Sequence, residues 1–549
     1  MTSQSWLRRL GDARAALIAF VLVELAAIPL LLSWGNKWWF WADDWDFLAG
    51  RTGGNFGDLF RPHYQHWTTL PILAYRLLWT LFGIRHYVPY QLLVIVLHLV
   101  AALLLRAVMQ KAGVRPWLAT LVAGAFVFFG AGAENILIAF QITFVGSLVF
   151  GLTQLLLADH NGPVNRRDWF ALLAGLAGLM CSGVGVTMTV IVAMAMLLRR
   201  GWRIALLQTV PLAVAYAVWS AASPKGYETV SYGSHSPVQI IKFVFIGAGA
   251  GFGRLAQLPG LGILLALVTV AGVVVAISRQ GFHELRGRFA VPVALVIGAG
   301  LFLLVTGVAR SGVPALAQHS LGTGPERARQ SRYVYLIAAM VLPAIAIAAD
   351  AIARRWRLLT IPVVLLLLAG VPGNVHQLRI YTQQGYPFRN ETRIDILAAP
   401  RLPLAGHVNP AIAPAKFAGL NMGWLLASLP SGRIPAPPHL TPTKISSETL
   451  KLVVREAKKP STENCAPLEH TQRRVLRGFQ RITLTTGNAL VTYFPLLGGE
   501  PSQPMQFPKT PTGRTLVAST GPLHLEIEPT HQPAVLCGPT FKTWTRQKQ

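Results

Sequence analysis

The sequence predicts a polytopic α-helical membrane protein with about 11 spans, followed by an exported C-terminal domain rich in β-strands. Three observations lead to this fold class. The 549 residues are 52% apolar and only 13% charged, a balance that favours a membrane protein over a large soluble one. Apolar runs near the ~20 residues that a helix needs to cross a bilayer recur through the first two-thirds of the chain. From residue 374 onward the chain is polar and Pro-rich, with short alternating runs.

The apolar runs define the expected spans in order. The first follows Arg8, Arg9 and Arg14 and lacks a small-residue cleavage motif, so we expect an uncleaved anchor. Spans are expected at residues 15–34, 87–108, 116–133, 136–157, 168–183, 184–198, 204–221, 260–278, 289–308, 333–353 and 358–373. The pair between 168 and 198 is short and interrupted by Ser182-Gly183-Val184-Gly185, which indicates a helical hairpin that crosses only part of the bilayer.

The charge distribution sets the expected orientation. The chain has 49 Lys and Arg against 22 Asp and Glu, a net charge of +27, but the basic residues gather in short clusters between apolar runs. Such clusters are Arg106/Lys111/Arg115, Arg166/Arg167, Arg199/Arg200/Arg203, Arg279/Arg286/Arg288 and Arg354/Arg355/Arg357. The positive-inside rule places them in the cytoplasm, with the N-terminus inside and the C-terminal domain outside a bacterial inner membrane. This pattern disfavours nucleic acid as a partner.

Two apolar stretches are expected to lie on the outer membrane surface, because counting them as spans would move basic clusters outside. One runs from Leu70 to Phe82 and the other from Ile240 to Leu258. The second contains glycines from Gly247 to Gly253. No strand precedes them and no Lys-Ser/Thr follows, so close helix packing is favoured over a nucleotide-binding loop.

The domain at 374–549 is expected to contain a Pro-rich connection at 429–443 and is a candidate for carbohydrate binding. Cys465 and Cys537 both fall in it, and an oxidising compartment would allow one disulfide between them. Cys181 lies in an apolar span and is expected to be a packing residue.

The strongest chemical lead is a group of acids in a Trp-rich segment that follows the first span. Asp43, Asp44 and Asp46 lie between Trp38 and Phe47. Aromatic side chains favour the lipid–water boundary. A carboxylate held there is partly desolvated, so its basicity rises and it becomes a candidate proton acceptor.

Histidines and arginines follow the acids. His63 and His66 are three residues apart, so on a helical turn they would point the same way. With Asp43 or Asp44 they could bind a divalent cation such as Mg²⁺ or Mn²⁺, but hydrogen bonding to phosphate or lipid headgroups is favoured. Further basic candidates for phosphate contacts are Arg61, Arg85, Arg310, His319, Arg327, Arg329 and Arg332, with Tyr333 beside the last.

Polar residues inside apolar spans are also candidates, because a charge in lipid is expensive. Glu134, Asn135 and Gln141 are expected near the outer boundary and the acid cluster. Glu24 and His98 are isolated, so hydrogen bonding between helices is the favoured explanation for them.

Together these segments resemble the GT-C class of membrane glycosyltransferases. The resemblance rests on Asp43-Asp44 after the first span, on Arg61-Pro-His-Tyr-Gln-His66, on the surface helix that ends at Gly83, on Glu134-Asn135 with Phe140-Gln141, and on Ser331-Arg332-Tyr333. It covers residues 1–373 in architecture. It implies an inverting hexosyl- or pentosyltransferase that uses a polyprenyl-phosphate-linked sugar and an extracytoplasmic glycan, lipid or protein acceptor.

The resemblance also implies roles for the residues. Asp43 is the first choice for the general base and Asp44 the supporting carboxylate. The residues expected to bind the donor phosphate are Arg61, His63, His66, Arg85, Arg332 and Tyr333, and those expected to line the cavity are Glu134, Asn135 and Gln141.

Other functions stay open at this point. A transporter or flippase for a lipid-linked or polar solute is the main alternative, although the candidate residues gather at one face rather than through the spans. Another enzyme that uses lipid-linked material, such as a ligase or phosphotransferase, and a scaffold with a degenerate site are further alternatives.

Overall fold

The computed structural model describes residues 3–51, 55–223, 234, 236–312, 324–456, 463–477, 480–495, 499–506, 514–518, 522–530 and 534–538. The chain forms two compact units. The first contains residues 1–38, 52–78 and 87–386. The second contains residues 39–51, 79–86 and 387–549. The second unit therefore takes in two short segments that the sequence analysis assigned to the membrane domain.

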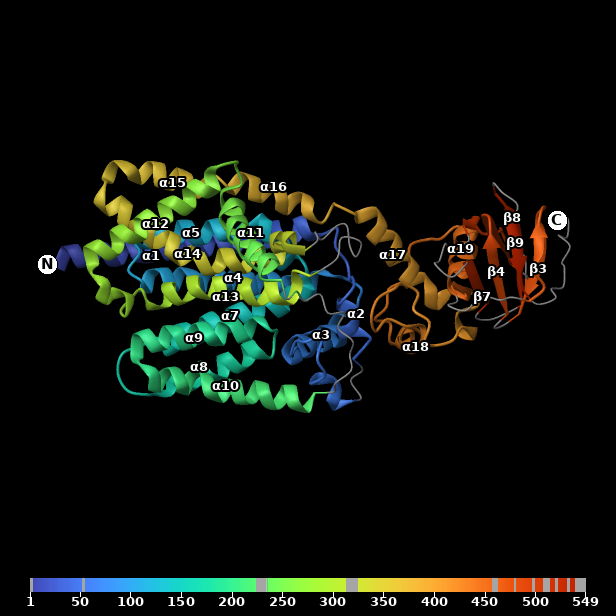
Figure 1. Ribbon diagram of the computed structural model, residues 1–549, viewed down its shortest axis with the longest axis horizontal. Coiled ribbons are helices and arrows are strands. Elements are labelled where there is room, and N and C mark those ends of the chain that lie inside the picture. Colours follow the sequence, from blue (N-terminus) through green and yellow to red (C-terminus); the bar gives the residue numbers. More distant parts are fainter. Residues whose placement is uncertain are drawn as a thin grey trace. The chain divides into compact units, whose positions relative to one another are not determined.

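The first unit is a bundle of helices (Figure 1). Its helices are α1 (Ser3–Gly35), α4 (Val88–Lys111), α5 (Pro116–Val127), α6 (Ala133–Leu137), α7 (Ile142–Ala158), α8 (Arg166–Leu179), α9 (Val184–Arg200), α10 (Trp202–Ala222), α11 (Pro237–Ala256), α12 (Leu261–Gln280), α13 (Ala290–Arg310), α14 (Ser331–Arg355), α15 (Thr360–Leu368) and α16 (Val371–Tyr381). The helix α3 (Thr69–Phe82) begins in this unit and ends in the second.

Nine helical segments in the described part of the chain are long and apolar enough to cross a membrane. They are Gly11–Gly35, Val88–Lys111, Ala139–Ala158, Trp202–Ala222, Pro237–Ala256, Leu261–Gln280, Ala290–Arg310, Ser331–Arg355 and Arg357–Arg401. The bent pair Pro116–Val127 and Gly130–Leu137 makes up to ten. The chain is therefore a multi-pass membrane protein by length and composition, and its described residues provide nine or ten candidate spans where 11 were expected.

The differences from the expected spans have local causes. The helices α8 and α9 have 14 and 17 residues, too few for a full span, and they are separated at Met180–Gly183, in keeping with the broken hairpin expected there. The stretch at Ile240–Leu258 was expected to lie on the surface, but α11 has the length and apolarity of a span. It was not expected to cross because counting it as a span would move basic clusters to the outer side; it also carries Lys242 and Arg254. The helix α3 has only 14 residues and stays a short apolar helix.

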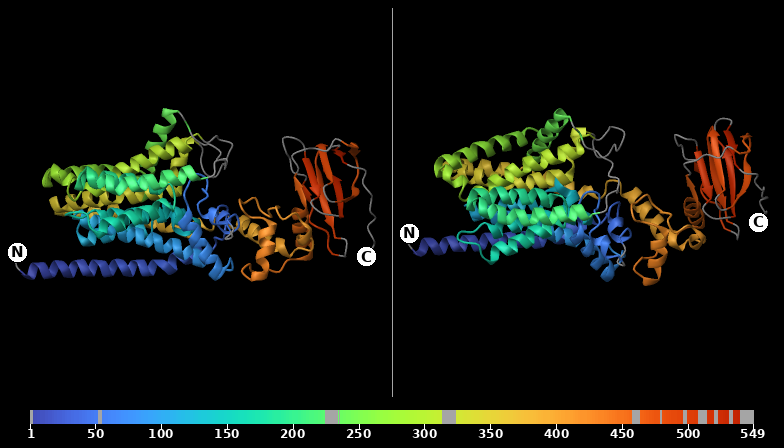
Figure 2. Two further views of the ribbon diagram at one scale, coloured as in Figure 1. Left: turned by 90° about the horizontal axis from the view of Figure 1, so that it is seen from below. Right: turned by 60° about the horizontal axis from the view of Figure 1, so that its bottom comes forward.

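The helix α14 is buried along nearly its whole length, and Figure 2 shows the bundle around it from two further sides. His98 of α4 joins it to α5, because its Nδ1 lies 2.9 Å from the hydroxyl of Tyr335 and its Nε2 lies 3.1 Å from the carbonyl oxygen of Val127. The expectation that His98 bonds neighbouring helices is therefore confirmed. A buried polar ring with both nitrogens bonded is a packing device.

An ion-pair network, here called the ionic clamp, ties one end of the α8–α9 pair to α7 and α4. Its members are Lys111, Asp159, His160, Asp168, Arg199 and Arg200. Asp168 is fully buried and accepts from Arg200 at 2.5 Å and His160 at 2.9 Å. Asp159 lies 2.9 Å from Lys111 and 3.0 Å from Arg199. Each buried carboxylate therefore has more than one cationic partner.

The second unit has a helical part and a β-part. Its helices are α2 (Asp44–Leu48), α17 (Tyr386–Ala398), α18 (Met422–Ser428) and α19 (Pro442–Val453). Its strands are β1 (Val454–Glu456), β2 (Ala466–Leu468), β3 (Gln472–Leu476), β4 (Arg481–Thr486), β5 (Ala489–Phe494), β6 (Met505–Gln506), β7 (Arg514–Ala518), β8 (Leu523–Pro529) and β9 (Ala534–Cys537). The expected β-rich region therefore begins only at Val454, because the chain before it forms helices and irregular structure.

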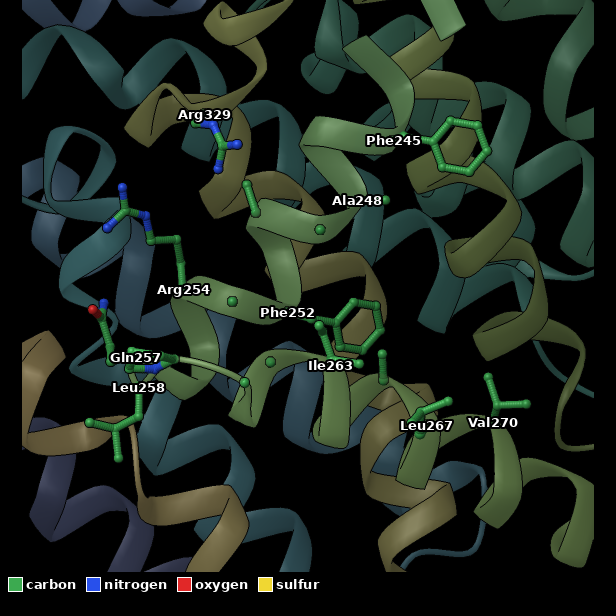
Figure 3. A pocket seen from close by; sticks show the side chains of 17 residues that line it. Phe245, Ala248, Phe252, Arg254, Gln257, Leu258, Ile263, Leu267, Val270 and Arg329 are labelled. Atoms are coloured by element: carbon green, nitrogen blue, oxygen red, sulfur yellow. The ribbon is translucent and has the colours of Figure 1, made fainter. Parts of the chain in front are cut away.

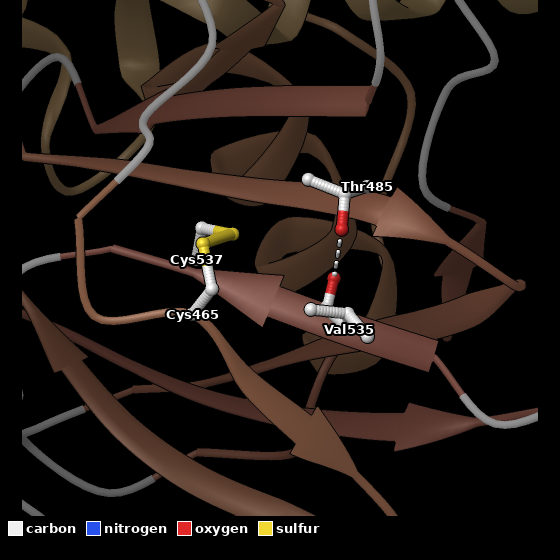
Figure 4. The surroundings of a disulfide bond; sticks show 4 residues. All are labelled: Cys465, Thr485, Val535 and Cys537. Atoms are coloured by element: carbon white, nitrogen blue, oxygen red, sulfur yellow. Dashed lines mark hydrogen bonds between the residues drawn. A yellow bond between two sulfur atoms is a disulfide. The ribbon is translucent and has the colours of Figure 1, made fainter.

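All strand pairs are antiparallel, in a five-stranded sheet of order β1-β7-β4-β9-β2 and a four-stranded sheet of order β3-β8-β5-β6. Along β8, Leu523, Leu525 and Ile527 are buried and alternate with more exposed residues, which is the pattern of a half-buried strand. Cys465 and Cys537 form a disulfide whose Cα atoms are 4.0 Å apart, so β2 is attached to β9 covalently as well as through the sheet (Figure 4).

The Trp-rich segment 39–51 packs within the second unit. Trp45 is fully buried, and its ring centroid lies 6.1 Å from that of Trp424 in α18. The ring centroids of Trp424 and Trp79 are 5.0 Å apart, and those of Trp41 and Phe417 are 4.8 Å apart. These contacts explain why residues 39–51 and 79–86 group with the chain after 387. The aromatic rings, expected at the lipid–water boundary, are core residues of this unit.

Candidate functional site

The three acids after α1 have different surroundings in the second unit. Asp44 is fully buried, and its Oδ2 accepts a hydrogen bond of 2.8 Å from the backbone N–H of Trp41. Asp46 pairs with the buried Arg51 at 2.9 Å. Asp43 precedes α2 and is partly exposed. Asp44 therefore holds the turn, Asp46 neutralises Arg51, and Asp43 is partly exposed.

The backbone near these acids is strained. Ala42 has a φ of 47°, in the left-handed region that L-residues with a Cβ rarely adopt. Tyr64, between the two candidate histidines, has a φ of 52°. Such conformations persist where the surrounding structure fixes them, and they cluster at functional sites.

His63 and His66 lie on a tight hairpin in the first unit, and the expectation of a helical turn is wrong. The backbone N–H of each donates to the carbonyl oxygen of the other, at 3.0 and 2.9 Å. The loop of two residues places a positive φ at Tyr64, its first central position, as primed hairpin turns require. Residues paired in this way project to the same side, so the side chains still share a face.

His66 connects this hairpin to the break between α8 and α9. Its Nδ1 accepts a hydrogen bond of 3.3 Å from the backbone N–H of Gly183. Burial is the main reason that the pKa of His66 falls from 6.5 to about 4. The charges of His63, Arg310 and Arg332 lower this pKa further. His66 is therefore neutral at pH 7 and lies in positive surroundings.

Arg310 and Arg332 come from neighbouring helix ends. Arg310 lies in the last turn of α13, and Arg332 in the first turn of α14. Together with His63 and His66 they form what is here called the cation cluster. The guanidinium of Arg332 donates to Oε1 of Gln330 at 2.9 and 3.2 Å. Its Cζ lies 5.4 Å from the centroid of the Tyr333 ring. Among the described residues, the guanidinium of Arg310 has no hydrogen bond or ion pair.

One carboxylate faces the cluster. Oε1 of Glu134 lies 3.7 Å from Nη1 of Arg332 and accepts a hydrogen bond of 2.9 Å from Gln141. The backbone N–H of Glu134 donates to Ser331, whose hydroxyl donates to the carbonyl oxygen of Ala131. These bonds fix the short helix α6 against the start of α14. Among the described residues Arg310 has no ion pair, so positive charge without a paired carboxylate is present in the cluster.

Asn135 lies beside Glu134 and is fully buried. Its amide nitrogen and oxygen have no hydrogen-bond partner in the described part of the chain, and Oε1 of Gln141 likewise has none. A buried amide without partners is unfavourable by about 1–3 kcal/mol unless water or a ligand binds it. Asn135 and Gln141 therefore offer hydrogen-bonding atoms to a ligand or water next to the cation cluster.

The other predicted residues have contacts elsewhere in the chain. Nη1 of Arg61 lies 3.8 Å from Oδ1 of Asp58 in the same loop. Arg85 belongs to the second unit, where it donates twice to the carbonyl oxygen of Gly432, at 2.7 and 3.0 Å. His319 lies outside the described residues. The structure thus brings His63, His66, Arg332 and Glu134 together in one unit, whereas Asp43, Asp44 and Arg85 belong to the other.

The described residues contain no group of three or more His, Cys, Asp and Glu side chains that could hold a metal ion. Two features of the cluster were not assigned from the sequence. One is the contact of Gly183 with His66, for which the interrupted apolar run at 182–185 was the available signal. The other is that Arg310, of the several arginines, acts on His66, which depends on where α13 ends relative to the hairpin.

Comparison of the chain with protein-family models, with curated proteins and with solved structures found no match.

Proposed function

We propose that the chain is a membrane glycosyltransferase that moves a sugar from a polyprenyl-phosphate donor to an extracytoplasmic acceptor, with inversion at the anomeric carbon. The cation cluster is the single observation that best supports this proposal. The guanidinium groups of Arg310 and Arg332, from the ends of α13 and α14, lie near enough to His66 for their positive charges to lower its pKa. Fixed cationic donors suit a phosphate on which negative charge increases during the reaction.

The proposed reaction takes its base, Asp43, from the resemblance found in the sequence, and its leaving-group residues from the cation cluster of the first unit. The carboxylate of Asp43 takes the proton of an acceptor hydroxyl, and the oxygen attacks the anomeric carbon from the side opposite the phosphate. The bond between that carbon and the phosphate oxygen breaks, and the phosphate leaves with the electron pair. Arg310 and Arg332 stabilise this leaving group. One base is sufficient for a direct displacement, whereas retention would require a carboxylate nucleophile.

Asp43 is the better candidate for the base than Asp44. Asp44 is fully buried and already accepts the N–H of Trp41, so it is suited to holding the turn. Asp43 stands at the start of α2 and is partly exposed. This assignment keeps the first choice made from the sequence and gives Asp44 the supporting role.

The test compares Asp43→Asn with Asp44→Asn, which are matched in chemistry. Asn at 44 keeps an oxygen that can accept the N–H of Trp41, so we expect most transfer activity to remain. Asn at 43 cannot act as the base, so we expect a loss of about 10²–10⁴-fold. Mass spectrometry of envelope glycans in a deletion strain that expresses each variant measures the transferred sugar. Equal, near-normal glycans from both variants contradict the proposal.

The same strains distinguish an enzyme from a transporter. A glycosyltransferase incorporates a labelled sugar into an acceptor. It does not need to move solute across the membrane of sealed vesicles. If Asp43→Asn stops vesicle transport while purified protein transfers no sugar, the flippase or transporter alternative replaces the proposal.

A further inference from the structure

The described helices α11 and α12 form one wall of a cavity of about 690 Å³ that the proposed reaction does not use (Figure 3). Its apolar lining includes Phe245, Phe252, Ile263, Leu267 and Val270. Polar side chains gather on the other side, where Figure 3 shows Arg254, Gln257 and Arg329. The cavity therefore has an apolar body and a cationic end, like the binding site of an amphiphile.

Arg254 is the residue that needs a partner. It lies in the last turn of α11, a helix with the length and apolarity of a span, and its side chain is exposed. Among the described residues its guanidinium has no ion pair or hydrogen bond. An arginine in a membrane helix is unfavourable unless an anion or water compensates it. Gln257 has partners of its own, because its amide bonds Asn374 and Gln377.

Arg329 supplies a second positive charge on the same cavity. It pairs with Glu326 at 2.6 Å, but both side chains are more than half exposed, so that pair is weak and leaves the guanidinium available. Two guanidinium groups at one end of an apolar cavity complement a single phosphate, because each offers a planar pair of donors to phosphate oxygens.

A second apolar cavity, of about 560 Å³, lies beside the first. It is lined by α11, α12, α13 and α14 and shares Ala248, Phe252, Ala266 and Val270 with the first cavity. Two adjacent apolar spaces with one cationic end match a lipid that has two chains and one phosphate. A free phosphate would leave both apolar spaces unfilled.

We propose that this pair of cavities binds an anionic two-chain phospholipid, with its phosphate on Arg254 and Arg329 and one acyl chain in each cavity. The site is separate from the cation cluster and does not depend on the proposed sugar transfer. The lipid would neutralise the charge that α11 carries at its end and would fill the space between α11, α12 and α13.

The test uses the full-length chain purified in detergent and stripped of lipid. Native mass spectrometry then counts bound phosphatidylglycerol, phosphatidylcholine and undecaprenyl phosphate at equal concentrations. We expect phosphatidylglycerol to bind on the order of tenfold more tightly than phosphatidylcholine, and the double variant Arg254→Gln/Arg329→Gln to lose that preference. Arg166→Gln is the matched control, an exposed arginine at the start of α8 that lines neither cavity.

A second variant tests the chains separately from the charges. Ala248→Trp places a large ring where the two cavities meet, so we expect weaker retention of phosphatidylglycerol although both arginines remain. Melting temperature without lipid shows that each variant is folded. Equal binding of phosphatidylglycerol and phosphatidylcholine overturns the proposal. Preferential binding of undecaprenyl phosphate also overturns it, because that lipid has one chain and would assign the cavities to the sugar donor.

Discussion

The cation cluster and the ionic clamp use the same side-chain types, yet they differ in how charge is balanced. Both touch the α8–α9 pair, at its opposite ends: the clamp through Asp168 and Arg200, and the cluster through Gly183 and His66. In the clamp each buried carboxylate has several cationic partners. In the cluster Glu134 lies 3.7 Å from Arg332, whereas Arg310 has no ion pair among the described residues. Full compensation indicates a structural role, and a surplus of one sign indicates capacity for a ligand.

The largest effect on stability is expected at the clamp. Asp168→Ala leaves Arg200 and His160 without their buried acceptor, so the free energy of unfolding should fall by about 3–5 kcal/mol. Thermal melting in detergent measures this loss. Arg288→Ala, which breaks an exposed pair with Glu284, is the control and should change the stability by less than about 1 kcal/mol. Equal, small effects of both variants would remove the distinction between clamp and surface pairs.

The cluster should show the reverse behaviour. Arg310→Gln is expected to leave the melting temperature unchanged, since its guanidinium has no partner in the described part of the chain. If Arg310 stabilises the leaving phosphate, the variant should reduce sugar transfer by about 10²–10³-fold, comparable to removal of one transition-state donor. Arg166→Gln, an exposed arginine near the clamp, serves as the control for both measurements. A destabilised Arg310→Gln protein would assign this residue to packing.

The response to acid offers a smaller test of the cluster. The pKa of His66 is about 4 in the folded state and near 6.5 in the unfolded state, so between these values the unfolded chain binds the proton more readily. Stability from neutral His66 is therefore present above pH 6.5 and is lost as the pH falls toward 4. His66→Gln should melt with a weaker dependence on pH between 7 and 5, whereas His86→Gln, at an exposed site, should behave like the wild type.

The smallest change is expected at Asn135. Leucine has a similar size and removes the amide atoms that have no partner among the described residues. The melting temperature of Asn135→Leu should equal that of the wild type or exceed it, by no more than the equivalent of about 1 kcal/mol. If the amide serves a ligand, sugar transfer falls while stability does not. A marked loss of stability would indicate that the amide is satisfied by buried water.

Much of the membrane region could be predicted from the sequence, because an apolar run of span length has few alternatives in a bilayer. The expectation that α11 lies on the surface followed from the placement of the basic clusters, whereas its length and apolarity also fit a span. Short elements were harder. His63 and His66 fit either a helical turn or a hairpin, and only the reciprocal backbone bonds decide between them.

Long-range packing was the other limit of the sequence analysis. The tryptophans near Asp43 have the composition of a lipid–water boundary, and nothing local indicates that Trp45 packs against Trp424. The same holds for Arg310, whose position beside His66 depends on where α13 ends. The candidate residues could therefore be named from the sequence, whereas which of them meet from distant segments could not.

The packing of Trp45 against Trp424 has a consequence for biosynthesis. The segment that carries Asp43 leaves the ribosome early, but its aromatic partners Trp424 and Phe417 are made only after the whole helical bundle. The turn around Asp43 therefore lacks its support until late in translation. If Asp43 is the base proposed above, a nascent chain should stay inactive until the segment that carries Trp424 and Phe417 has been made and folded.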